Sequence, residues 1–305
     1  MGFHANPTRN FNLGRALAYP ALRKHMRLLY TILALSAVIL GSWWIWNTNH
    51  ELRNFVSEYV DNGEFLTIQA RYTADQIMTE HRNELLPDKE HSFQESELKF
   101  HPYLLMEVKY CKGDKKSCEG VLLWSQIDGE MVINTDNWEK THGFEDAIKA
   151  EATKTDFTIL NALAKNGGRL SKDQLIKELQ MEANLLDPWI ENLRKKHLIV
   201  LKGGNLQLHF HNPKIAVVPQ TQITEWLVTK PYNHAQKVSG KYSRNQIEAI
   251  AYAAFGEDFT IRDVTQIYLP VYGIEVSNPD GSRLSTFWNA LNGKRITPKY
   301  LADTK

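Results

Sequence analysis

The chain has 305 residues, of which 43% are hydrophobic and 23% are charged, an ordinary balance for a globular protein. Its formal net charge of +1 gives no overall field that would recruit nucleic acid or anionic lipid. The sequence lacks the short motifs of nucleotide-binding proteins, serine hydrolases and zinc proteases. We therefore predict a non-enzymatic protein with no cofactor, no metal and no small-molecule substrate, although carboxylates distant in sequence leave no spacing signal.

An apolar run near the start of the chain is its strongest feature. Residues 28–46 (LLYTILALSAVILGSWWIW) contain no charged side chain. As a helix they would span roughly 28 Å, close to the hydrocarbon thickness of a bilayer. The run is long for a signal peptide, and no small-residue cleavage site follows it. We predict a single transmembrane helix, with a signal peptide or a buried core helix as the alternatives.

The charges on either side of this run predict its orientation. Residues 1–27 carry five basic side chains and no acidic one, whereas residues 47–64 carry four acidic side chains and one basic. Basic flanks stay in the cytoplasm, and indole rings favour the membrane interface. We therefore predict a cytoplasmic tail at 1–27 and an extracytoplasmic body, anchored in the inner membrane. The expected interface residues at the outer end are Trp43, Trp44 and Trp46.

The first part of the body, residues 47–150, predicts a stalk helix followed by a small antiparallel α+β domain. Helical spacing continues after the span, and a second helical pattern runs from Phe65 to Leu86, followed by a loop. Three strand-like runs come next, and Asp128-Gly129 between the last two is typical of a hairpin turn. Two tryptophans in this part, Trp124 and Trp138, are expected in the core or on the face of the sheet.

Two cysteines, Cys111 and Cys118, enclose a polar segment that contains Gly-Asp and is typical of a turn. If the flanking strands pair, the two thiols would lie opposite each other and could form a disulfide worth about 2.5 kcal/mol. Such a bond is expected in an oxidising compartment, in agreement with an extracytoplasmic body. Two reduced cysteines remain the alternative.

Residues 153–212 predict three helices and a two-stranded hairpin. A capping box of Ser171 and Gln174 opens the second helix, and Asp187 with Pro188 is typical of the start of the third. Two apolar strand-like runs then flank a Gly-Gly-Asn turn. This order resembles the winged-helix fold, which implies a DNA-binding recognition helix.

The start of that third helix does not suit DNA. Its side chains include none of the Arg, Lys, Asn or Gln residues that read base edges, and Asp187 would face phosphate. We therefore predict no nucleic-acid partner. The apolar side chains at this end are instead our candidates for protein binding, with packing inside the unit as the alternative: Leu185, Leu186 and Trp189.

The last segment, residues 213–305, predicts a second α+β domain. A capping box of Ser243 and Gln246 opens a helix that Gly256 ends, and two strands then flank an Asn-Pro-Asp-Gly turn. Residues 267–296, which include VYGIEVSNPDGSRLSTFWNALNGKRI, resemble the last hairpin of small PepSY-type domains. That resemblance implies binding or inhibition at a membrane.

Together these features predict an α+β multidomain protein with one N-terminal transmembrane helix. The leading hypothesis is a membrane-anchored, protein-binding scaffold or assembly component of a bacterial envelope complex, such as a secretion, conjugation or division machine. Its partners would be the bilayer, through residues 28–46, and other proteins of the complex. The main alternative is a membrane-bound winged-helix transcription regulator with a cytoplasmic body, and an envelope enzyme of unrecognised type is a third.

Overall fold

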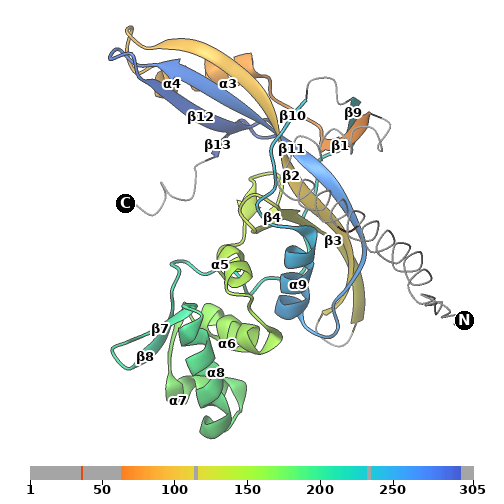
Figure 1. Cartoon of the computed structure of the whole chain (residues 1–305), viewed down its shortest axis with the longest axis vertical. Helices are drawn as coiled ribbons and strands as arrows, with labels where there is room; N and C mark the ends of the chain where they lie inside the picture. Colours follow the sequence, from red (N-terminus) through yellow and green to blue (C-terminus); the bar gives the residue numbers. More distant parts are fainter. Residues whose placement is uncertain (1–35, 37–62, 113–115, 232–234, 297–305) are drawn as a thin grey trace, which may run out of the picture. The chain divides into compact units, whose positions relative to one another are not determined.

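The computed structural model describes residues 63–112, 116–231 and 235–296, together with Ser36. It is a mixed α+β protein with a large sheet and several helices (Figure 1). The predicted tail, membrane span and stalk lie outside these residues, apart from Ser36. Within the part of the chain that is described, no helix is both long enough and apolar enough to cross a membrane.

The large sheet has ten strands, seven of which follow the order β13-β12-β11-β2-β3-β4-β5. Of the other three, β1 pairs with β11 and β9, and β10 pairs with β2. The strands are β1 (Glu64–Ile68), β2 (Ser92–Lys112), β3 (Lys116–Ser125), β4 (Met131–Asn134), β5 (Glu139–Lys140), β9 (Leu227–Pro231), β10 (Gln236–Lys237), β11 (Thr260–Ser277), β12 (Arg283–Asn289) and β13 (Arg295–Ile296).

Strands β2 and β11 are the centre of this sheet. They pair antiparallel from Lys109↔Thr260 to Ser92↔Ser277. Strand β1 likewise pairs antiparallel with β9. Segments 47–150 and 213–305, predicted as separate α+β units, thus contribute strands to the same sheet. Pairing between strands so far apart in sequence cannot be predicted from a local pattern, because the residues of each strand are the same whichever strand it pairs with.

The helix predicted from Phe65 to Leu86 is wrong in its first part. Residues 64–68 form β1, and the short helices α3 (Ala74–Glu80) and α4 (Arg82–Leu85) follow. Apolar residues three apart, such as Phe65 and Ile68, fit a buried strand as well as a helix in so short a run. The expected loop before the sheet is also too long, since β2 begins at Ser92. The hairpin at Asp128-Gly129 is confirmed by the pairing of β3 with β4.

Helices α5 (Phe144–Lys149) and α9 (Arg244–Phe255) lie next to the large sheet. A smaller sheet of order β6-β8-β7 lies with three further helices, in the chain order α6, β6, α7, α8, β7, β8 (Figure 1). The capping boxes predicted for α7 and α9 are confirmed. The bounds are α6 (Lys154–Lys165), β6 (Arg169–Ser171), α7 (Lys172–Leu179), α8 (Ala183–Lys195), β7 (Ile199–Lys202) and β8 (Asn205–Leu208).

The predicted start of α8 is wrong. The helix begins at Ala183 with Glu182 as its N-cap, so Pro188 lies inside it. Proline removes one backbone hydrogen bond there. The apolar residues of α8 nevertheless bury one continuous stripe at helical spacing, which offsets that loss: Leu186, Ile190 and Leu193.

One continuous core joins a face of the large sheet to the helices. Trp124 of β3 contacts Phe144 of α5 at 4.9 Å between ring centroids, and Phe144 contacts Phe157 of α6 at 5.9 Å. The same cluster continues into α7, α8 and α9. The expectation of a core position is thus met for Trp124, whereas Trp138 is partly buried against a second cluster that includes Tyr103 of β2.

Candidate functional site

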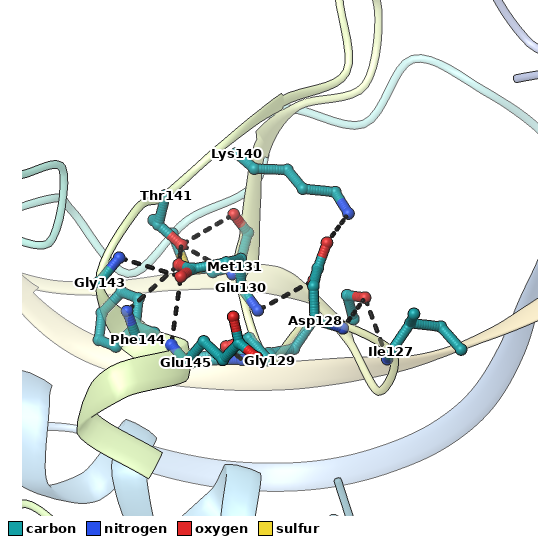
Figure 2. A network of polar contacts seen from close by, with 12 residues as sticks. Ile127, Asp128, Gly129, Glu130, Met131, Lys140, Thr141, Gly143, Phe144 and Glu145 are labelled. Atoms are coloured by element: carbon teal, nitrogen blue, oxygen red, sulfur yellow. Dashed lines mark hydrogen bonds and ion pairs between the residues drawn. The ribbon is translucent and has the colours of Figure 1, made fainter. Parts of the chain in front are cut away.

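A group of buried charged side chains lies between the β3–β4 turn and α5 (Figure 2). Glu130 is only 4% exposed. Its carboxylate accepts hydrogen bonds from the backbone N–H groups of Gly143 (2.9 Å), Phe144 (3.2 Å) and Glu145 (3.1 Å), and from Thr141 Oγ1 (2.8 Å). A carboxylate at a helix N-terminus satisfies orphan donors and complements the dipole. Its place in this arrangement is to hold α5 against the sheet.

A second charged group lies on the other side of the same turn (Figure 2). Lys140 Nζ donates to Asp128 Oδ2 at 2.7 Å and lies 5.3 Å from the centroid of the Tyr103 ring. Burial alone would raise the pKa of Asp128, but the charge and hydrogen bond of Lys140, together with hydrogen bonds from Ser125 and the Glu130 backbone, outweigh it and lower that pKa. Burial, together with the positive charge of Lys140, lowers the pKa of His101 to about 4. His101 is therefore neutral at physiological pH.

Trp138 joins this group in a strained conformation. Its φ is 56°, a left-handed value that is unfavourable for a bulky residue. Its indole packs edge-on against Tyr103 at 5.6 Å between centroids. The buried Nε1 atom has no hydrogen-bond partner among the described residues. Backbone strain is maintained only where the surrounding structure imposes it, so the packing against Tyr103 is important for this edge of the sheet.

Glu145 connects α5 to the segment before α9. It accepts hydrogen bonds from Lys241 Nζ at 2.9 Å and from the Tyr242 hydroxyl at 3.0 Å, and it pairs with Lys149 at 3.0 Å. The hydrogen bond to Glu145 raises the pKa of Lys241, and burial raises the pKa of Tyr242. The contacts with Lys241 and Tyr242 join α5 to the segment before α9.

The chemistry of these groups favours a structural role. Glu130 is surrounded by donors from its own chain, and Asp128, Lys140 and Glu145 each face a partner of opposite charge or a hydroxyl. Such satisfied networks specify and rigidify a fold. In the ranges that the structure describes, no three histidine, cysteine or acidic side chains are grouped so that they could hold a metal ion.

The candidate binding residues of α8 differ in exposure. Leu185 is 55% exposed, Leu186 is fully buried and Trp189 is partly buried against the core. Leu186 therefore packs inside the unit, which is the alternative given above for these residues. Leu185 and Trp189 lie four residues apart and so on one side of the helix.

The charges beside them are paired within the unit. Asp187 pairs with Lys172 of α7 at 2.6 Å, and Glu191 pairs with Arg194 at 2.5 Å. Lys195 follows in the last turn of α8, where a basic side chain complements the helix dipole. The accessible side of α8 thus combines an exposed apolar side chain with charges that are largely neutralised.

The most exposed large apolar side chain among the described residues was not predicted. Trp226, just before β9, is 77% exposed. Its carbonyl accepts a hydrogen bond from Gln69 N at 2.9 Å, which joins it to the residue directly after β1. The adjacent Glu225 carboxylate is buried and pairs with Arg71 at 3.4 Å. The sequence gives only one indication of this exposure, which is that Trp226 lies outside any periodic apolar pattern.

The two cysteines, Cys111 and Cys118, are both present as thiols in the structure. Strand pairing sets Tyr110 opposite Cys118 and Cys111 opposite Ser117. Because side chains alternate along a strand, Cys111 and Cys118 point to opposite faces of the sheet. The expected pairing of Cys111 with Cys118 is wrong by one residue in the register of the two strands. That register depends on the conformation of the loop between them, which a turn rule does not supply.

The predicted interface tryptophans, Trp43, Trp44 and Trp46, lie outside the described residues. Comparison of the chain with protein-family models, curated proteins and solved structures finds no match.

Proposed function

We propose that the chain is a membrane-anchored scaffold or assembly component of a bacterial envelope complex, such as a secretion, conjugation or division machine. The observation that carries this proposal is the uncharged run at 28–46, with basic residues before it and acidic residues after it. On this proposal the span lies in the inner membrane, the tail is cytoplasmic and the body binds other proteins outside the cytoplasm. The proposed role requires no catalysis.

Two exposed side chains support a protein-binding role. Leu185, on helix α8, and Trp226, just before β9, are large, apolar and exposed, and tryptophan in particular supplies much of the binding energy of protein interfaces. The buried polar groups support it less directly, since they are satisfied by their own chain and leave no free acid–base pair for chemistry.

The second candidate is a membrane-bound transcription regulator. The chain order α6, β6, α7, α8, β7, β8 favours it, because we propose that this unit is of winged-helix type. Against DNA binding stand the paired charges of α8 and the exposed Leu185 at the end that would meet base edges. We therefore propose that the unit binds protein.

A topology reporter fused after residue 305 separates the two candidates. Activity of a reporter that works only outside the cytoplasm agrees with the scaffold, and activity of one that works only inside agrees with the regulator. Fractionation of the full chain into the soluble extract would contradict both.

Crosslinking in intact cells tests the binding surface. Leu185→Asp and Trp226→Asp should each reduce the yield of crosslinked neighbours, because a charge replaces an apolar contact. Leu284→Asp is the matched control, since Leu284 is a 46% exposed leucine of β12. Equal yields from all three variants would contradict the proposed surface.

A further inference from the structure

The ladder of β1 and β9 is joined to the large sheet by little backbone pairing. Strands β1 and β9 pair with each other along their whole length, from Glu64↔Pro231 to Ile68↔Leu227. Between β1 and β11, in contrast, the described residues form one registered pair, Thr67↔Tyr268, strengthened by a hydrogen bond from Thr67 Oγ1 to the Tyr268 carbonyl (2.9 Å). Side chains must therefore supply much of the attachment.

Three aromatic rings meet at this junction. Phe65 of β1 contacts Phe100 of β2 at 4.9 Å and Tyr268 of β11 at 5.3 Å between centroids, both edge-to-face. Phe65 and Phe100 are 5% and 4% exposed. The cluster thus connects the β1–β9 ladder to the two central strands of the sheet.

Two lysines add their positive charges to these rings. Lys237 of β10 has its buried Nζ atom 5.3 Å from the centroids of both Phe65 and Tyr268. Lys230 of β9 has its Nζ atom 5.8 Å from the centroid of Phe100. Both distances are within the range of cation–π attraction, which strengthens when the cation is desolvated.

The strand that carries Lys237 is itself held on β2. Strand β10 pairs parallel with Lys99 and Phe100, and Val238 N donates to the Phe100 carbonyl at 2.9 Å. Lys237 is thereby set on the large sheet while it contacts β1. Lys230, conversely, is set on the β1–β9 ladder while it contacts β2.

We propose that Lys230 and Lys237 form a reciprocal cation–π clamp that fastens the β1–β9 ladder to the large sheet. When the clamp loosens, the ladder opens as one unit while the rest of the fold stays intact. Sub-global opening of this kind is expected where an element has few contacts with the remainder of a fold; the single registered pair with β11 meets this condition, and the buried Ile68 sets the free-energy cost of opening. The exposed Trp226, bonded to Gln69 directly after β1, would move with the ladder. The clamp would then control how Trp226 is presented.

Hydrogen exchange of the full chain in detergent, followed by mass spectrometry of peptides, tests the clamp. The variant Lys230→Met/Lys237→Met keeps much of the apolar length and removes the charge, whereas Lys230→Arg/Lys237→Arg keeps the charge. We expect the methionine variant to exchange the amides of β1 and β9 about tenfold faster, in proportion to the lost cation–π attraction. The arginine variant should stay within about threefold of wild type, and α9 and β12 should be unchanged in both.

Three results would overturn the proposal. Equal exchange in the methionine and arginine variants would show that charge is irrelevant. Faster exchange of β9 without β1 would show that the ladder does not open as a unit. Faster exchange throughout the fold would show that the lysines belong to the general core, and the single variant Lys230→Met repeats the test if the double variant does not fold.

Discussion

Replacement of Glu130 by glutamine should weaken the junction between the large sheet and α5. In the wild-type chain, Glu130 Oε1 accepts from the N–H groups of Gly143 and Glu145, and Oε2 accepts from Phe144 N–H and Thr141 Oγ1. Glutamine keeps the shape but replaces one oxygen by an NH₂ donor. That group would face Phe144 N–H, donor against donor, and the charge that complements the helix start would be lost.

The magnitude follows from the number of bonds. Two of the four hydrogen bonds lose their acceptor, and each bond to a charged group contributes about 1.5 kcal/mol or more, so Glu130→Gln should cost about 3 kcal/mol. For a folded unit of this size, about 3 kcal/mol corresponds to a drop in Tm of roughly 6–12 °C. Differential scanning fluorimetry of the chain in mild detergent would measure it.

A matched control is available at the start of α8. Glu182 is the exposed N-cap of that helix and makes no side-chain capping bond, so Glu182→Gln should change Tm by less than about 2 °C. A Tm for Glu130→Gln within 2 °C of this control would refute the reasoning, because it would mean that water replaces the lost acceptor at no cost.

The remaining predictions concern pH, the thiols and the proline of α8. Because the pKa of His101 falls from 6.5 to about 4 on folding, the unfolded chain binds more protons between these values. Stability should therefore decrease as the pH falls from 6.5 to 4, and His101→Gln should flatten this part of a Tm–pH curve. Intact mass without reductant should show two alkylatable thiols, at Cys111 and Cys118; a mass 2 Da lower that resists alkylation would contradict their opposite facing. Pro188→Ala should raise Tm by an amount equivalent to about 1–3 kcal/mol, since a helical hydrogen bond becomes possible; an unchanged or lower Tm would count against a helix interior at this position.

The local signals in the sequence were reliable where a short motif determines the structure. The capping boxes at Ser171 and Ser243 bring two orphan donors together within four residues, and both are present. The Asp128-Gly129 turn likewise needs only a positive φ, which Gly129 supplies at 70°. These features depend only on residues that are neighbours in sequence, so the local sequence is sufficient to predict them.

Features that depend on distant residues could not be predicted in the same way. The pairing of β1 with β9 joins residues that are over 150 positions apart, and β2 with β11 is similar. The Glu130 network could not be predicted for the same reason. From the sequence, a glutamate beside a turn is expected to be exposed to solvent, and only the fold brings the start of α5 next to its carboxylate. Exposure is equally non-local, as Trp226 shows.

The error at the start of α8 shows how a local rule can fail with consequences for function. Proline at the first turn of a helix is the common case, which favoured a start at Asp187 and left Leu185 in a loop. Burial of Leu186, Ile190 and Leu193 extends the helix back to Ala183 instead. The earlier start sets Leu185 and Trp189 one turn apart on a rigid helix. An interface side chain on an ordered helix loses less entropy on binding than one on a loop, so the corrected boundary strengthens Leu185 as a binding candidate.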